Sequence, residues 1–167
     1  MKTAIVVFGL FLGPIVLGQS FNLEAVEGAW KGTLEMYSLA TKKDSQPEVT
    51  LTIQPLIKDS VWVWRTDYIS EQYGTISKDY TMRVIDHTAG TYILDEGDGI
   101  LLEQQLSGNA MYSIFEVQDQ ILTAKYTFHQ DEIEFEVCNS TKSQDTTDVL
   151  SHRVENIQRV ILKRVKQ

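Results

Sequence analysis

After residue 27, apolar and polar residues alternate through nearly all of the chain, and this period limits the fold more than any other feature. Because side chains point alternately to the two faces of a strand, a period of two predicts β-strands with one buried face. The predicted strands are 28–40, 47–57, 60–69, 74–86, 90–96, 99–107, 110–117, 120–129, 131–139 and 156–165. The chain is therefore expected to be all-β, with about ten strands.

Short polar segments separate most of these strands, for example 86–90, 95–99 and 107–109. Their Asp, Asn, Ser and Gly residues favour tight turns, which join neighbouring antiparallel strands into hairpins. A meander of about ten strands keeps two unpaired edges unless the sheet closes on itself. We therefore predict a single antiparallel up-and-down β-barrel, with a two-sheet sandwich as the alternative. One helical turn is expected, at 22–27, where it would close one end of the barrel.

The first twenty residues differ from the rest of the chain. Lys2 precedes an uncharged, mostly apolar run over 4–17, and the small residues Gly18 and Ser20 follow it. This order is typical of a secretory signal peptide, and the run is short for a membrane span. We predict that 1–20 is a signal peptide, that 21–167 forms the barrel domain, and that the product is exported, either periplasmic or secreted. No transmembrane segment is expected after the signal peptide is removed.

The charge and the cysteine content exclude some classes of partner and of stabilisation. The formal net charge is −8, so the chain has no electrostatic reason to bind nucleic acid or an anionic membrane surface. Cys138 is the only cysteine and cannot form an internal disulfide, so the core alone must hold the domain together.

Within the strands, the alternation predicts which side chains point into the barrel. The inward sets are Trp30, Leu34 and Met36; Val49, Leu51 and Ile53; and Ile133, Phe135 and Val137. In the segment 61–65 the period is ambiguous, since Trp62 and Trp64 compete with the two valines beside them for the interior.

The first predicted strand opens with glycines on both sides of a tryptophan, Gly28, Trp30 and Gly32. Glycine weakens a strand because it has no side chain to pack, so a bend or a close bulky neighbour is expected there. The Trp30 ring itself is the predicted bulky group.

Gly28-Ala29-Trp30, in the first strand of an up-and-down meander, resembles the GxW signature of the lipocalins and the wider calycin superfamily, including exported bacterial lipocalin-like domains of unassigned function. The resemblance implies that a basic residue from the last strand packs over the Trp30 ring and closes the barrel. Arg164 is preferred, because it shares its parity with Val160 and Leu162, and Arg159 is the alternative. The similar nitrobindin-type haem barrels carry a histidine near the closing arginine. Residues 156–167 have none, so no cofactor is expected.

The sequence shows no assembled catalytic or metal-binding group. His87, His129 and His152 fall at or near turns and are too far apart in sequence to form a ligand pair. Cys138 follows a run of glutamates on one face, which disfavours a reactive thiolate. The chain is therefore not expected to be an enzyme, although a few calycin relatives use such a pocket for catalysis.

The strands are rich in aromatic residues, which either fill a solid core or line an apolar cavity. The first hypothesis is a barrel that binds a small, mostly apolar molecule non-covalently. The predicted ligand-binding residues are Trp62, Trp64, Tyr80, Tyr92 and Tyr112. The alternative is a solid barrel that meets another protein of the cell envelope through an exposed aromatic surface near Trp62 and Trp64.

Overall fold

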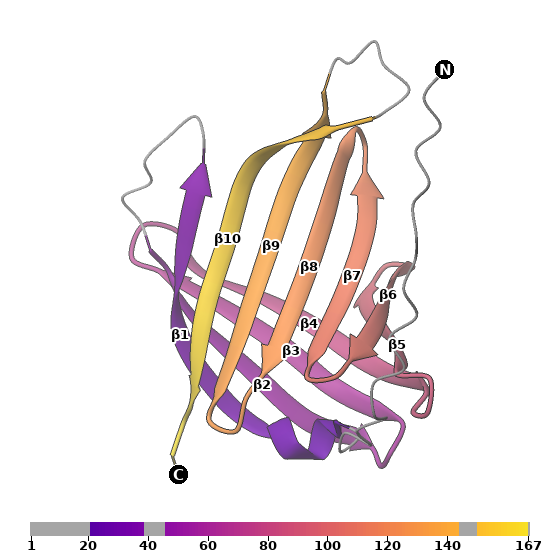
Figure 1. Ribbon diagram of the computed structural model, residues 1–167. Helices are drawn as coiled ribbons and strands as arrows, with labels where there is room; N and C mark the ends of the chain where they lie inside the picture. Colours follow the sequence, from indigo (N-terminus) through magenta and orange to yellow (C-terminus); the bar gives the residue numbers. More distant parts are fainter. Residues whose placement is uncertain (1–20, 39–45, 144–149, 167) are drawn as a thin grey trace, which may run out of the picture.

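The computed structural model describes residues 21–38, 46–143 and 150–166, and within them the chain forms a closed antiparallel β-barrel. The strands follow one another around the barrel in sequence order, and the last strand pairs with the first (Figure 1). The predicted signal peptide, 1–20, lies outside the described residues.

The elements begin with a 3-10 helix, η1 (Leu23–Val26), which is the helical turn predicted for 22–27. The strands are β1 (Gly28–Ser38), β2 (Glu48–Ile57), β3 (Val61–Ser70), β4 (Gly74–Asp86), β5 (Thr91–Gly97), β6 (Ile100–Ser107), β7 (Ala110–Val117), β8 (Gln120–Phe128), β9 (Glu132–Lys142) and β10 (His152–Arg164).

The predicted up-and-down barrel is confirmed, because β1 pairs antiparallel with β2 on one side and with β10 on the other. This closure excludes the alternative of a two-sheet sandwich. The largest error in the predicted strand limits is at β10, which begins at His152 instead of 156. Its extra residues pair with the end of β9 beyond a register shift between Val154 and Asn156.

The interior contains the side chains that the alternation predicts. Val49, Leu51 and Ile53 of β2 are buried, and their neighbours in sequence are more exposed. The ambiguity in β3 is resolved in favour of the tryptophans, since Trp62 is 3% and Trp64 is 0% exposed. The exposed aromatic surface that the interaction hypothesis placed at these two residues is therefore absent.

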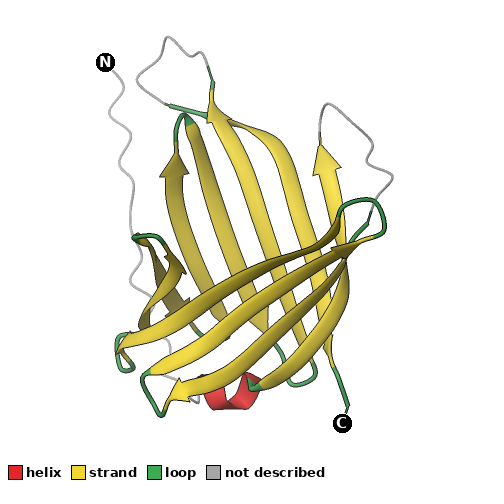
Figure 2. Cartoon of the chain, turned by 180° about the vertical axis from the view of Figure 1, so that it is seen from behind, coloured by secondary structure: helices red, strands yellow, loops and turns green. Residues whose placement is uncertain are grey.

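The helical turn η1 lies at one end of the barrel (Figure 2), and the side chains of Trp30 and Arg164 close this end together with it. The Trp30 indole is fully buried and donates its Nε1–H to the carbonyl of Val26, at 2.9 Å. The Arg164 guanidinium lies 4.1 Å from the centre of this ring and donates to the carbonyls of Glu27 and Ala25, at 2.6 and 2.7 Å. A single side chain of the last strand thus joins the first strand to the helical turn.

The two glycines of β1 have a different role from the predicted one. A Cβ on Gly32 would lie 2.2 Å from the carbonyl oxygen of Ile161, so the glycine allows the backbones of β1 and β10 to approach closely. Gly28 has a φ of +132°, and a Cβ there would lie 3.3 Å from the Arg164 guanidinium. The close neighbours are therefore the β10 backbone and Arg164, and not the Trp30 ring.

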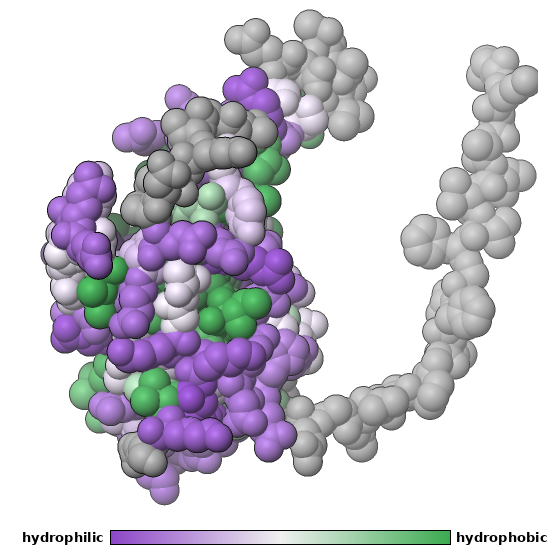
Figure 3. All heavy atoms as spheres, turned by 90° about the vertical axis from the view of Figure 1, so that its left-hand side faces the viewer, coloured by the Kyte–Doolittle hydropathy of each residue, from purple (hydrophilic) through white to green (hydrophobic). Residues whose placement is uncertain are grey.

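Arg159, the alternative closing residue, lies on the outer face of β10, where it forms an ion pair with Glu134 of β9. On the face seen in Figure 3, hydrophilic side chains predominate and the apolar ones form separate groups. Among the described residues, no helix is long and apolar enough to cross a membrane.

We expect Arg164→Met to lower the free energy of unfolding by ~2 kcal/mol, because it removes the cation over Trp30 and two charged hydrogen bonds. Arg164→Lys keeps the charge but loses the planar guanidinium that donates to two carbonyls, so it should lower the free energy of unfolding by an intermediate amount. Urea denaturation followed by tryptophan fluorescence measures both. Arg159→Met is the control on the same strand and should have a smaller effect, because its ion pair is partly screened by solvent. Equal losses for the two methionine variants would contradict the closing role of Arg164.

Candidate ligand cavity

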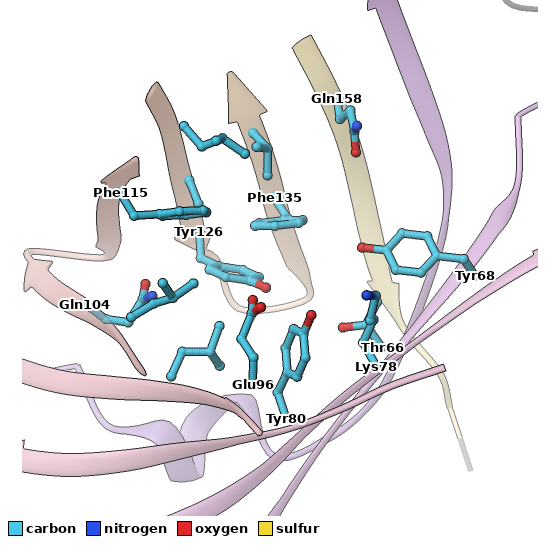
Figure 4. A pocket seen from close by; sticks show the side chains of 15 residues that line it. Thr66, Tyr68, Lys78, Tyr80, Glu96, Gln104, Phe115, Tyr126, Phe135 and Gln158 are labelled. Carbon is cyan, nitrogen blue, oxygen red and sulfur yellow. The ribbon is translucent and has the colours of Figure 1, made fainter. Parts of the chain in front are cut away.

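A cavity of about 380 Å³ occupies the half of the barrel away from η1 (Figure 4). Each strand from β3 to β10 contributes to the cavity wall. These strands extend beyond the packed closed end, and their inward-facing side chains there line the cavity. The apolar lining residues are Leu94, Leu102, Phe115, Leu122, Ala124, Phe135 and Val137. The polar lining residues are Thr66, Tyr68, Lys78, Tyr80, Glu96, Gln104, Tyr126 and Gln158. The barrel is thus filled at one end and hollow at the other.

Aromatic contacts connect the packed core to the cavity. Trp64 of the core donates its Nε1–H to the hydroxyl of Tyr126, at 3.1 Å, and their rings meet edge to face. Tyr126 in turn stacks on Phe135 of the neighbouring strand, with ring centres 4.2 Å apart. These contacts hold the Tyr126 ring in a fixed orientation, so this part of the cavity wall is preorganised.

Three phenols and one carboxylate come together within the polar part of the cavity. In Figure 4 the carboxylate of Glu96 points toward the hydroxyls of Tyr80 and Tyr126, and the Tyr68 hydroxyl points into the same space. Burial, with the charge and a hydrogen bond of Glu96, raises the pKa of Tyr80 from 10.0 to about 12. Burial also raises the pKa of Tyr126 and of Tyr68. The phenols therefore stay protonated and able to donate hydrogen bonds.

Glu96 enters the cavity from an irregular point of β5. The pairing of β5 with β6 shifts between Asp95 and Gly97, so Glu96 stands at a β-bulge. Asp95 and Gly97 flank Glu96 at the end of β5, where the Asp95 carboxylate accepts the amide N–H of Gly97, at 2.9 Å. A bulge locally redirects the strand, and bulges are common beside binding sites.

Gln104 of β6 is the most deeply buried polar side chain of the wall, at 3% exposed. Among the described residues, nothing forms a hydrogen bond with its amide. This amide lines the cavity, so it is available to a hydrogen-bonding group placed inside it.

Only Tyr80 of the five predicted ligand-binding residues lines this cavity. Trp62, Trp64 and Tyr92 are buried in the packed closed end, because their positions lie nearer to that end of their strands. Tyr112 is 43% exposed and pairs with Lys125 on the outer face, since the inward positions of β7 are its neighbours Met111 and Ser113. These four predicted residues therefore lie outside the wall of this cavity.

The alternation of the sequence contains a signal for the cavity residues that are absent from the predicted ligand-binding set. Tyr92, Leu94 and Glu96 share one parity in β5, as do Leu102 and Gln104 in β6. The predicted turn at 95–99 includes Glu96, whereas in the structure β5 continues through Glu96 to Gly97.

The described residues contain no group of three or more His, Cys, Asp or Glu side chains able to hold a metal ion. His87, His129 and His152 are all exposed.

No protein-family model and no curated protein match the chain. Among solved structures, it is similar to a protein of unknown function of the DUF3598 family from Nostoc punctiforme, with a TM-score of 0.62 and 13% identity. That match covers 87% of this chain and 49% of the other, so the chain spans about half the length of that protein. At this identity the similarity shows the barrel fold alone.

Two other solved structures match with lower scores. The Echinococcus granulosus fatty-acid-binding protein 1 has a TM-score of 0.44 and 10% identity, over 86% of this chain and 99% of the other. The structure of EF1p2_mFAP2b bound to DFHBI has a TM-score of 0.41 and 10% identity, and the match covers 85% of this chain and 95% of the other. Scores this low add nothing to the assignment of a function.

Because of Tyr80, the free energy of unfolding of the barrel should fall as the pH rises through the alkaline range. Its phenol ionises near pH 10.0 in the unfolded chain but only near pH 12 in the folded one. The contribution to stability is thus complete below pH 10.0 and is lost as the pH rises to about 12. Urea unfolding over this range should show a steeper loss of stability in the wild type than in Tyr80→Phe.

The matched control is Tyr73→Phe, which removes an exposed phenol and leaves the Tyr80 and Glu96 contact intact. An equally steep loss in Tyr80→Phe and in the wild type would contradict the assigned environment of Tyr80.

Proposed function

We propose that the barrel binds a small, mostly apolar molecule non-covalently in the cavity between β3 and β10. The observation that carries this proposal is the cavity itself, about 380 Å³ inside an otherwise packed barrel. Ligand pockets commonly have volumes from ~300 Å³ upward and combine apolar walls with a few polar groups. Leu102, Phe115 and Val137 provide the apolar wall, and Tyr80 and Glu96 provide polar groups.

The contacts beneath the cavity also support binding. Tyr126 and Phe135 are held by their stacking and by the bond from Trp64, so a ligand would meet rings that are already in place. A preorganised wall reduces the entropy lost on binding. Binding is favoured over the role of a solid interaction module, because that hypothesis required a filled interior and an exposed surface at Trp62 and Trp64.

The proposal includes export and a lipocalin-like ancestry. The apolar run of 4–17 supports export, and Gly28-Ala29-Trp30 with Arg164 over the indole supports the lipocalin-like assignment. A ligand carrier outside the cytoplasm would agree with the acidic charge and the single cysteine.

If residues 1–20 are a signal peptide, the protein recovered from its host should begin close to residue 21. We expect N-terminal sequencing of the protein from the envelope or the medium to give this start. Cell fractionation with a cytoplasmic marker is the control. A protein that keeps its first twenty residues and fractionates with that marker would overturn the export proposal.

Ala124→Trp should block the cavity. Ala124 lies in the wall between Leu122 and Tyr126, so a large side chain there would take up ligand space. Native mass spectrometry of the full-length gene product, purified from its host without denaturation, should show a bound mass that is released on unfolding. We expect the occupancy to fall at least tenfold in the variant, because overpacking excludes the ligand.

The matched control is Thr123→Trp, one residue away on the same strand but facing outward beside Ile114. It should keep the bound mass. A wild-type protein without any bound mass, or equal occupancy in the two tryptophan variants, would count against binding in this cavity.

A further inference from the structure

We propose that the ligand is an organic cation, an ammonium group on an apolar body, with its nitrogen held between Glu96 and the surrounding tyrosines. This inference rests on the proposed function and specifies the ligand class of the same cavity.

The first argument is the unpaired charge of Glu96. Its carboxylate is half-buried in the cavity wall, and no Lys, Arg or His of the described residues forms an ion pair with it. The other charged lining residue, Lys78, is exposed. Withdrawing a carboxylate from water without a cationic partner is unfavourable, so a cation inside the cavity would be stabilised there.

The second argument is the aromatic surface around this carboxylate. Tyr68, Tyr80, Tyr126 and Phe135 surround the space into which Glu96 points (Figure 4). The faces of aromatic rings carry negative electrostatic potential and attract cations, and this attraction increases where water is excluded. Rings on several sides with one carboxylate are a suitable environment for an alkylammonium group.

The third argument is the supply of hydrogen-bond acceptors. A primary ammonium group has three N–H donors and no acceptor. The two oxygens of Glu96 and the phenol oxygens of Tyr80 and Tyr68 can accept from it. The side-chain amide oxygen of Gln104 provides a further acceptor on the same wall. The cavity therefore offers enough acceptors for every donor of the ligand.

An anionic ligand fits the same cavity less well. A carboxylate at the depth of Glu96 would meet a like charge in a region of low dielectric constant. The net charge of −8 also gives the whole molecule a potential that attracts cations and repels anions. Lys78 is the lining residue that would favour an anion, so the test below includes an anionic probe.

Three probes with the same indole body separate the charge from the shape of the ligand. Tryptamine carries an ammonium group, 3-ethylindole is neutral and indole-3-propionate carries a carboxylate. In calorimetric titrations of the full-length protein at neutral pH, tryptamine should bind about tenfold more tightly than 3-ethylindole, and indole-3-propionate should bind most weakly. This comparison needs no variant.

Glu96→Gln removes the charge and keeps the size of the side chain. It should weaken tryptamine binding about tenfold and leave 3-ethylindole binding unchanged. Glu116→Gln on the exposed face of β7 is the control and should bind all three probes as the wild type does. Far-ultraviolet circular dichroism checks that both variants are folded, and if Glu96→Gln is not, the wild-type comparison still decides.

Tightest binding of indole-3-propionate, or unchanged tryptamine binding in a folded Glu96→Gln, would overturn the cation inference. Binding of 3-ethylindole or indole-3-propionate in preference to tryptamine, abolished by Ala124→Trp, would leave the proposed function standing. If none of the probes binds but the native protein carries a bound mass, only the cation inference fails. If no probe binds and the native protein carries no bound mass, the cation inference and the proposed function both fail.

Discussion

The contact between Arg164 and Trp30 is the interaction on which the rest of the barrel depends. It joins the last strand to the first and, through the carbonyls of Ala25 and Glu27, to the helical turn below them. Because the guanidinium lies on an aromatic face and donates to two carbonyls, its charge is accommodated at the closed end although no carboxylate of the described residues forms an ion pair with it. One end of the barrel is thereby packed solidly, which allows the other end to remain hollow.

The two halves of the barrel obey different physical requirements. Near η1, apolar side chains such as Trp64 and Ile53 fill the interior and stabilise the fold by burial. In the other half, Glu96 and Gln104 stand at inward positions, where an apolar residue would be more stable. Such exceptions to the core pattern are common at functional sites. The bulge at Glu96 and the polar side chain of Gln104 belong to the same cavity wall, which favours a ligand role for this wall.

The architecture could be predicted from the sequence because it repeats a local signal many times. Each strand carries its own alternation, each turn carries its own Gly, Asn or Asp, and about ten such units leave few ways to satisfy the sheet edges. Arg164 could be preferred over Arg159 from parity and the family resemblance together. The aromatic residues of the cavity could not be chosen in this way. Tyr80, Tyr92 and Trp62 all point inward, and parity does not say how far each lies from the closed end.

The sequence by itself determined the strand order and the inward face of most strands, because neighbours in sequence set these, while the closing pair was indicated by parity together with the family resemblance. The tertiary structure alone decided where the packed core ends and the cavity begins. That boundary depends on the stagger between strands far apart in sequence, and on the volume that side chains such as Trp64 and Tyr126 fill when they meet across the barrel. Glu96 acquires its significance only there, since a carboxylate next to a turn becomes a cavity residue when three tyrosines from other strands surround it.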